Sequence, residues 1–126
     1  MPQHVLEVYS RSRVLARQPP LFDGVRAAGC REQGVFDLID QSGRESGYVT
    51  FMLEDGSSVL GRYNGTLAAR RWLDGSRHYD VRGTLELTGG SGRFGKIRGQ
   101  LRIWQALDPV ADSSQGQAEG EYWFEP

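Results

Sequence analysis

The stretch GYVTFMLEDGSSVLGRY, residues 47–63, decides the fold class. In its first half, Val49, Phe51 and Leu53 alternate with residues of the opposite face, which is the period of a β-strand with one buried side. Asp55-Gly56 follows, and a second alternating run begins at Ser58. Because an Asp-Gly pair readily supplies the positive φ of a tight hairpin turn, the stretch predicts two antiparallel strands joined by a short turn.

The same alternation, broken by turn residues, continues on both sides of this hairpin. We expect strands at Met1–Ser10, Gly34–Asp40, Gly47–Glu54, Ser58–Trp72, His78–Thr88, Lys96–Gln105 and Gly120–Phe124. We expect turns or loops at Gln41–Arg44, Asp74-Gly75, Gly89–Gly92, Leu107–Gln117 and, with a short helix as the alternative, Arg11–Pro20.

Glycines inside these strands favour a strongly curved sheet. Glycine makes up 17 of the 126 residues, and Gly61, Gly65, Gly83 and Gly99 fall on the apolar face of their strands. Glycine at such positions permits the bends of a small barrel. We therefore predict an all-β fold, a small closed antiparallel β-barrel of about seven to eight strands, calycin-like, in preference to a sandwich. Residues 1–126 are expected to form a single domain.

Charge and cysteine content narrow the possible functions. The formal net charge is -1, which gives no electrostatic footprint for nucleic acid. Cys30 is the single cysteine, and the two histidines, His4 and His78, lie far apart in the sequence. We therefore predict no metal site and no cofactor. The first residues lack the features of a secretory signal and no membrane segment is visible, so a cytoplasmic location is expected.

Residues 90–95, GSGRFG, fit the GxGxxG pattern of dinucleotide-binding proteins. In those proteins the glycines open a helix whose N-terminus holds the pyrophosphate. Here the following residues alternate as a strand. We therefore interpret the match as coincidental.

Candidate chemistry rests on carboxylates and aromatic residues. A carboxylate inside an apolar barrel has a raised pKa and can exchange protons with a ligand. We predict three catalytic candidates: Glu54, Asp55 and Asp37. An aromatic-lined cavity suits a small ligand, and the ligand-binding candidates are Tyr48, Met52, Tyr63, Tyr79 and Trp104. The alternative is a structural role: the acids lie on the solvated face of the sheet, and the aromatic residues pack in the core or in subunit contacts.

Two segments resemble a known family. They are GTLELTGGSGRFGKIRG at residues 83–99, in which a strand runs into a glycine-rich loop and on to Ile97-Arg98-Gly99, and DGSSVLGR at residues 55–62. Together they resemble the allene oxide cyclase-like and dirigent-like β-barrel proteins over about Gly47–Ile103. Ser91 stands where that loop usually has Thr.

The resemblance implies an eight-stranded antiparallel barrel, commonly a dimer or trimer, with a cavity for an apolar or phenolic molecule. Such relatives direct a cyclisation or a radical coupling without a cofactor, often helped by one or two acids. Glu54 and Asp55 lie at the positions comparable with those acids.

Three classes of function remain open. The first in rank is a barrel that binds a small apolar or phenolic molecule without assigned chemistry. The second is a cofactor-independent cyclase or isomerase, which requires a buried acid or tyrosine with a shifted pKa facing the cavity. The third is a barrel filled by its own side chains that acts as an interaction protein. For each class we expect a homo-oligomer, a dimer or trimer, and neither a nucleic acid nor a membrane as partner.

Overall fold

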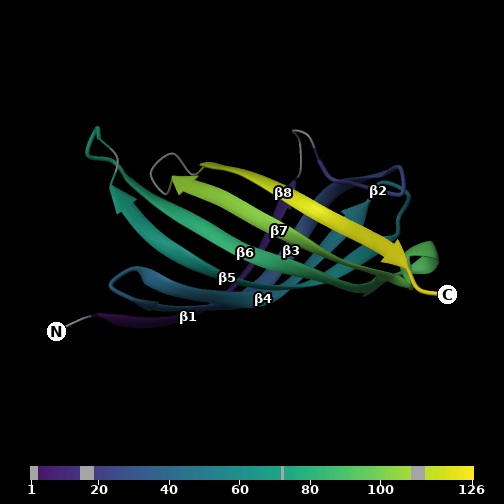
Figure 1. The fold of residues 1–126 in the computed structure, drawn as a ribbon, viewed down its shortest axis with the longest axis horizontal. Coiled ribbons are helices and arrows are strands. Elements are labelled where there is room, and N and C mark those ends of the chain that lie inside the picture. The colour runs from purple at the N-terminus through teal and green to yellow at the C-terminus, as the bar shows by residue number, and fades with distance from the viewer. Residues whose placement is uncertain (1–2, 15–18, 72, 109–112) are drawn as a thin grey trace.

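The computed structural model describes residues 3–14, 19–71, 73–108 and 113–126, which form one antiparallel sheet of eight strands (Figure 1). The strands are β1 His4–Val14, β2 Leu21–Phe22, β3 Val25–Ile39, β4 Ser42–Leu53, β5 Ser58–Arg71, β6 Arg77–Gly90, β7 Ile97–Asp108 and β8 Ser113–Phe124. A short 3-10 helix, η1 (Gly92–Phe94), follows β6. The sheet order is β1-β3-β4-β5-β6-β7-β8, with β2 paired to β3 alone. The predicted all-β antiparallel fold is confirmed.

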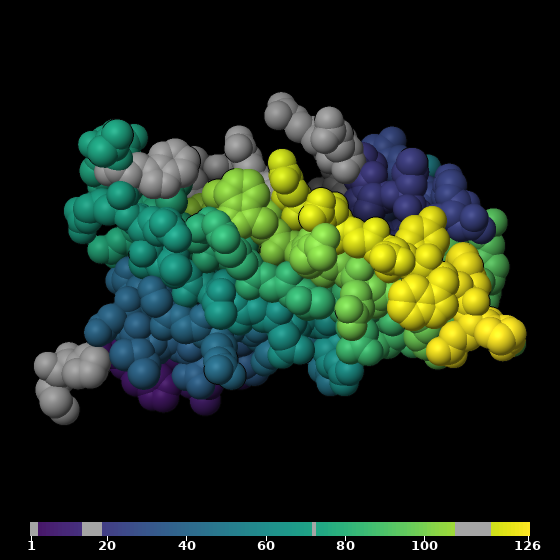
Figure 2. Space-filling model, viewed as in Figure 1, coloured from purple at the N-terminus to yellow at the C-terminus, as the bar shows by residue number. Residues whose placement is uncertain are grey.

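The sheet is coiled, so that β1 and β3 pass behind β6 and β7 in Figure 1. Strands β5 to β8 lie side by side across the face seen in Figure 2, from teal to yellow. We call the face that carries the buried hydrophobic residues the inner face, and the opposite face the outer face.

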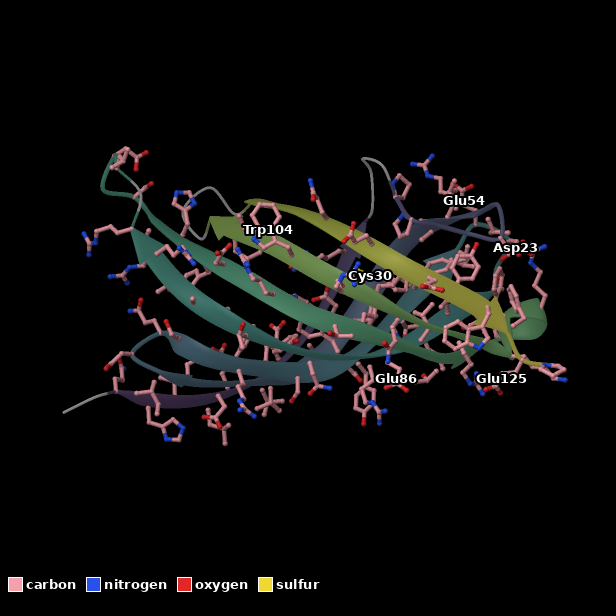
Figure 3. All side chains as sticks on the ribbon, in the orientation of Figure 1. Asp23, Cys30, Glu54, Glu86, Trp104 and Glu125 are labelled. Carbon is pink, nitrogen blue, oxygen red and sulfur yellow. The ribbon has the colours of Figure 1, made fainter. Side chains whose placement is uncertain are left out.

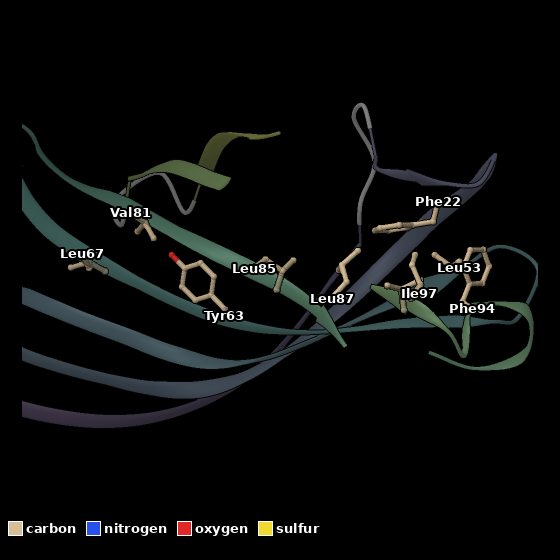
Figure 4. Packing of buried hydrophobic residues seen from close by; sticks show 11 residues of the cluster. Phe22, Leu53, Tyr63, Leu67, Val81, Leu85, Leu87, Phe94 and Ile97 are labelled. Carbon is tan, nitrogen blue, oxygen red and sulfur yellow. The ribbon is translucent and has the colours of Figure 1, made fainter. Parts of the chain in front are cut away.

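The hydrophobic core is built from every second residue of the strands. In β5, Val59, Tyr63 and Leu67 are buried and their neighbours in sequence are more exposed. In β6, Leu85 and Leu87 are each 1% exposed. Burying such a side chain contributes about 1.5–3 kcal/mol. Figure 4 shows this cluster, with the hydroxyl of Tyr63 directed toward Val81. The predicted alternation in β4 to β7 is therefore confirmed.

The two edge strands of the sheet, β1 and β8, are not paired with each other in the part of the chain that the structure describes. Backbone pairing therefore does not show the predicted closure into a barrel. At one end, however, the turn between β2 and β3 reaches β8 through side chains. The backbone N–H of Asp23 donates to the hydroxyl of Tyr122 at 2.9 Å. Arg93 in η1 donates to the carbonyl oxygen of Asp23 at 2.7 Å.

Aromatic rings fill this end of the molecule. The ring centroid of Phe22 lies 5.3 Å from that of Phe51 and 6.0 Å from that of Tyr122. Phe22 itself is 2% exposed and Phe94 is fully buried. Strand β2 thus supplies the hydrophobic side chain that covers this end of the inner face.

Several strand boundaries differ from the prediction. The expected loop at Arg11–Pro20 is wrong for residues 11–14, which extend β1, and β3 begins at Val25 rather than at Gly34. The expected loop at Leu107–Gln117 is wrong at both ends, because β7 runs to Asp108 and β8 begins at Ser113. The predicted features at Met1–Pro2, 15–18, Trp72 and 109–112 lie outside the described residues.

The sequence does not reveal the strand at residues 11–14 because both faces of this part of β1 carry polar side chains. Arg11 and Arg13 point inward and alternate with the outward-facing Ser10 and Ser12. Neither face of this segment is apolar, so the period of two that reveals a half-buried strand is absent from the sequence.

The turns follow the local backbone requirements. The β3–β4 turn is Asp40-Gln41, both with positive φ, rather than the predicted Gln41–Arg44. In the β4–β5 and β5–β6 turns only the glycine of the Asp-Gly pair, Gly56 or Gly75, takes positive φ, whereas in the β2–β3 turn both Asp23 and Gly24 do. In the first two turns the aspartate accepts hydrogen bonds through its side chain. Asp55 accepts the backbone N–H of Ser57 at 2.9 Å.

No helix in the described part of the chain is long and apolar enough to cross a membrane.

Candidate functional site

A group of polar side chains occupies the inner face of β1, β3 and β4. The cross-strand register places Arg11 opposite Glu32 and Arg13 opposite Cys30. Glu45 of β4 shares the face of Phe51 because the two residues are an even number of positions apart in one strand. We call this group the inner polar cluster; its members are Tyr9, Arg11, Arg13, Cys30, Glu32 and Glu45.

Glu32 holds the two arginines of the cluster. Its carboxylate lies 2.6 Å from Nε of Arg11 and 3.5 Å from Nε of Arg13. The side chain of Glu32 is 15% exposed, whereas those of the arginines are 35% and 25% exposed. One carboxylate therefore faces two guanidinium groups at the β1 side of the sheet, and the arginines are the part of the cluster nearest to solvent.

Glu45 is the buried acid of the cluster, with only 6% of its surface exposed. Its carboxylate accepts a hydrogen bond from the hydroxyl of Tyr9. Burial raises the pKa of Glu45 above its ordinary value of 4.5, and the nearby Glu32 raises it further. The positive charge of Arg11 acts in the opposite direction. The net rise favours the protonated form, which can donate a proton to a bound molecule.

Tyr9 is held in place by its neighbours. Its ring centroid lies 4.6 Å from that of Phe36, and the guanidinium carbon of Arg11 lies 5.0 Å from the ring centroid on the ring face. Burial and the charge of Glu45 raise the pKa of Tyr9 well above its ordinary value of 10.0. Tyr9 therefore stays a neutral hydrogen-bond donor at physiological pH.

Tyr63 lies on the same inner face as Tyr9, and strands β3 and β4 lie between the two. It is 6% exposed, and its hydroxyl is buried without a hydrogen-bond partner among the described residues. The hydroxyl lies over Gly65 and Gly83, where a β-carbon would collide with it. Burial, followed by the charge of Glu45, raises the pKa of Tyr63 above its ordinary value.

Cys30 belongs to the cluster, but its thiol is held in the unreactive, protonated form. Its Sγ lies 3.7 Å from a carboxylate oxygen of Glu32. Burial and the charge of Glu32 raise the pKa of the thiol from 9.0 to about 11. The reactive thiolate is therefore scarce at physiological pH.

The three predicted catalytic acids lie away from this cluster. Glu54 forms an exposed ion pair with Arg26 at 3.6 Å, at the end of the sheet where Asp23 also lies (Figure 3). Asp55 lies in the β4–β5 turn, where hydrogen bonds from Ser57 lower its pKa. Asp37 is on the outer face, paired with His4 at 2.7 Å. Glu54 and Asp55 adjoin at one end of the sheet, Asp37 lies apart from them on β3, and all three are exposed.

The predicted ligand-binding residues divide between the two faces. Tyr63 and Tyr79 lie on the inner face, and the hydroxyl of Tyr79 is 3.5 Å from Oε1 of Gln41. Tyr48 and Met52 face outward, 66% and 37% exposed. Trp104 on β7 also faces outward, and its Nε1 donates to Asp80 at 3.0 Å.

Two of the outward-facing candidates line surface grooves. Tyr48 lines a groove of about 610 Å³ together with Val8, Gln33, Arg62 and Asn64. On the other half of the sheet, Trp104 lines a groove of about 570 Å³ over β6, β7 and β8. Both grooves mix apolar and polar side chains, and Glu45 lines neither of them.

No group of three His, Cys, Asp or Glu side chains in the described ranges is arranged to hold a metal ion. Comparisons of the chain with protein-family models, with curated proteins and with solved structures found no match. The resemblance to allene oxide cyclase-like and dirigent-like proteins therefore stays a prediction.

Sequence reasoning missed Glu45 and Tyr9, although a signal for Glu45 was present. Counting back by twos from the apolar Phe51 gives Val49, Gly47 and then Glu45. A strand that begins two residues earlier, at Glu45, places this acid on the inner face. Around Tyr9 the sequence shows no alternation, because the adjacent Val8 is also apolar.

Proposed function

We propose that this chain binds a small, mainly apolar molecule against the inner face of its sheet, with the inner polar cluster at one side of the ligand. The observation that supports this proposal is the burial of Glu45 beside Tyr9. Taking a carboxyl group out of water is costly, and buried titratable groups with shifted pKa values concentrate at binding and catalytic sites. The partly buried Phe36, Leu101 and Ile103 supply an apolar surface for the ligand.

The same proposal includes the closure of the sheet into a barrel and the association of the chain with copies of itself. We propose that the coiled sheet acts as a barrel, with β1 and β8 approaching each other. The contact of Asp23 with Tyr122 supports this, since it links β8 to the turn that precedes β3. The predicted homo-oligomer is supported by the exposed Leu6 and Val8 of β1, 67% and 78% exposed. A cytoplasmic location stays a prediction.

Binding is tested by nuclear magnetic resonance with a panel of cyclic ketones and substituted phenols at millimolar concentration. We expect chemical-shift changes at inner-face residues such as Phe36, Leu101 and Ile103. The Leu101→Trp variant, which fills space on the inner face, should weaken binding, while Tyr48→Ala on the outer face should not. Shift changes confined to the outer face, or none with any compound, would overturn the proposal and favour a barrel filled by its own side chains.

A second candidate function, a cofactor-independent isomerase or cyclase, is favoured by the raised pKa of Glu45. In its ionised form the carboxylate can accept a proton from a carbon next to a ligand carbonyl. The resulting carboxylic acid can return that proton to a different carbon of the same molecule, so that no oxidant or reductant is needed. Glu45 is thus proposed as the catalytic acid and base, in place of Glu54, Asp55 and Asp37.

Proton exchange provides the test of this second function. A ketone that binds is incubated with the protein in deuterium oxide, and deuterium uptake next to the carbonyl is followed by mass spectrometry. We expect Glu45→Gln to abolish uptake above the background rate. Glu86→Gln removes an exposed carboxylate from the outer face and should leave uptake unchanged. Equal uptake with all three proteins would exclude Glu45 as the acid and base.

A further inference from the structure

The hydroxyl of Tyr63 is a buried polar group that lacks a partner among the described residues. Tyr63 is 6% exposed, and its Oη atom makes no hydrogen bond there. Buried hydroxyls in proteins are nearly always hydrogen-bonded, because an unpaired one has lost its water without compensation. A retained unpaired hydroxyl on the inner face therefore requires an explanation.

The position of this hydroxyl is set by two glycines. A β-carbon on Gly83 would lie 2.6 Å from the Tyr63 oxygen, and one on Gly65 would lie closer still. Gly65 and Gly83 are cross-strand partners of each other. The two glycines therefore leave space on the sheet that the tyrosine hydroxyl fills.

The same register places Glu45 next to this hydroxyl. Glu45 on β4 is the cross-strand partner of Gly65 on β5, and side chains of such partners start about 4.5–5.5 Å apart. Tyr63 and Glu45 thus place a hydroxyl and a carboxyl group side by side. Phe36 and Ile103 continue this row on either side and are only partly buried.

The charges around Tyr63 indicate which ligand atom suits it. After burial, the main causes that raise the pKa of Tyr63 are the negative charge of Glu45 and then Tyr9 and Glu32. A carboxylate or phosphate ligand would therefore place a second acidic group beside Glu45, which is unfavourable whenever both are ionised. An uncharged oxygen acceptor meets no such repulsion.

We propose that the hydroxyl of Tyr63 donates a hydrogen bond to an uncharged oxygen of the bound molecule, a carbonyl oxygen on an apolar body, beside Glu45. This inference rests on the proposed function and names its ligand class as neutral ketones or esters. Because protein atoms cover the hydroxyl, the ligand must displace a neighbour. Phe36 and Ile103 are the partly buried side chains that can move aside.

The test uses two probes of nearly the same shape, 2-acetylnaphthalene and 2-ethylnaphthalene, which differ chiefly in the carbonyl oxygen. We expect the unaltered protein to bind the ketone about five- to tenfold more tightly than the hydrocarbon, the ratio that one neutral hydrogen bond provides. Tyr63→Phe should remove this preference by weakening ketone binding alone. Tyr48→Phe, a tyrosine on the outer face, should leave both affinities unchanged.

Two further measurements separate a ligand contact from a structural role. In the infrared spectrum, the carbonyl stretch of the bound ketone should move to higher frequency in Tyr63→Phe, because a hydrogen bond to the carbonyl is lost. In urea unfolding without ligand, Tyr63→Phe should be at least as stable as the unaltered protein, because it removes an unpaired buried hydroxyl. This variant is therefore expected to fold.

The possible results distinguish the two proposals. If both probes bind at the inner face with equal affinity and Tyr63→Phe changes neither, the hydroxyl contacts no ligand oxygen, and this inference is overturned while the proposed binding function stands. If neither probe binds at the inner face, both proposals are overturned. If Tyr63→Phe destabilises the protein and leaves the carbonyl stretch unchanged, the hydroxyl has a structural role only.

Discussion

A β-carbon at Gly83 would lie 2.6 Å from the hydroxyl oxygen of Tyr63, so the tyrosine covers a glycine that has no room for a side chain. The backbone is as near: the carbonyl oxygen of Asn64 would lie closer still, and the Cα atom of Gly65 would lie 2.8 Å from the same point. Gly83→Ala therefore forces either the tyrosine or the backbone to shift. We expect a loss of about 1–3 kcal/mol in the free energy of unfolding, as is typical of an overpacked core.

Urea unfolding measures this loss, and Gly95→Ala is the matched control. Gly95 has helical backbone angles, and a β-carbon there would have its nearest contact at 3.5 Å. The control should change stability by far less than Gly83→Ala. Equal effects of the two substitutions would show that the space over Gly83 is not required by Tyr63.

The raised pKa of Glu45 predicts how stability depends on pH. The folded protein binds the proton more tightly than the unfolded chain, whose carboxyl titrates near the ordinary value of 4.5. The stabilisation is complete below that value and is lost as pH rises through the higher pKa of the folded state. The free energy of unfolding should therefore fall with rising pH in this window, and Glu45→Gln should remove that part of the slope.

This prediction is checked by urea unfolding at a series of pH values. The groups that face Glu45 are Tyr9, Arg11, Arg13 and Glu32, and none of them is altered in the variant. Glu54→Gln, which removes an exposed carboxylate from the end of the sheet, controls for the change in net charge. If both variants reduce the pH dependence of the free energy of unfolding equally, overall charge rather than the burial of Glu45 causes that dependence.

Glu32 is expected to stabilise the fold more than a comparable acid on the outer face. Glu32 lies 2.6 Å from Arg11 with its side chain 15% exposed, and Glu86 lies 2.8 Å from Arg62 with its side chain 47% exposed. Glu32→Ala should cost about 1.5–3 kcal/mol, because it leaves two partly buried guanidinium groups without a carboxylate. Glu86→Ala should cost less than about 1 kcal/mol.

Thermal or urea unfolding of both alanine variants at moderate and at high salt makes the comparison. Salt should reduce the small effect of Glu86→Ala, because exposed pairs are screened. The effect of Glu32→Ala should persist. A cost for Glu32→Ala no larger than that for Glu86→Ala would contradict a structural role for the inner cluster.

Cys30 should react slowly with thiol reagents in the folded protein. A pKa of about 11 in place of 9.0 leaves about 100-fold less thiolate at pH 8, and the thiolate is the reactive form. The rate of alkylation by iodoacetamide should therefore rise about tenfold per pH unit between pH 7 and 10. Unfolding the chain in urea should abolish the protection.

The cause of the shift can be tested separately. Glu32 raises the pKa of Cys30, so Glu32→Gln should accelerate alkylation, whereas Glu86→Gln on the outer face should not. Fast alkylation of the unaltered folded protein at pH 8 would show that the thiol is neither buried nor held in its protonated form.

The sequence predicts the strands where one face is apolar and fails where both faces are polar. Leu85 and Leu87 alternate with the polar Thr84, Glu86 and Thr88, so their burial follows from the period of two. In β1 the inward-facing Arg11 has no such contrast with its neighbours, since its compensating charge, Glu32, lies on another strand. A pairing between distant residues cannot be inferred from local polarity.

The candidate site shows the same limit. Tyr63 could be placed on the inner face because its strand was assigned over nearly its full length. The predicted strand does not include Glu45, because the turn that precedes it is Asp40-Gln41, a two-residue turn without glycine. The sequence signal for a turn lies further along the chain, at Ser42-Gly43. An error of a few residues in one turn therefore removed the buried acid from consideration.

Each long strand of this sheet pairs with the long strand that follows it in the chain. No strand has to wait for a distant partner, so the order of pairing can match the order of synthesis. Hairpins close within microseconds once both arms are available, while the ribosome adds about 5–20 residues per second. The β3–β4 ribbon, which joins Glu32 and Glu45, can therefore form before β6 is made, and β8 completes the molecule last.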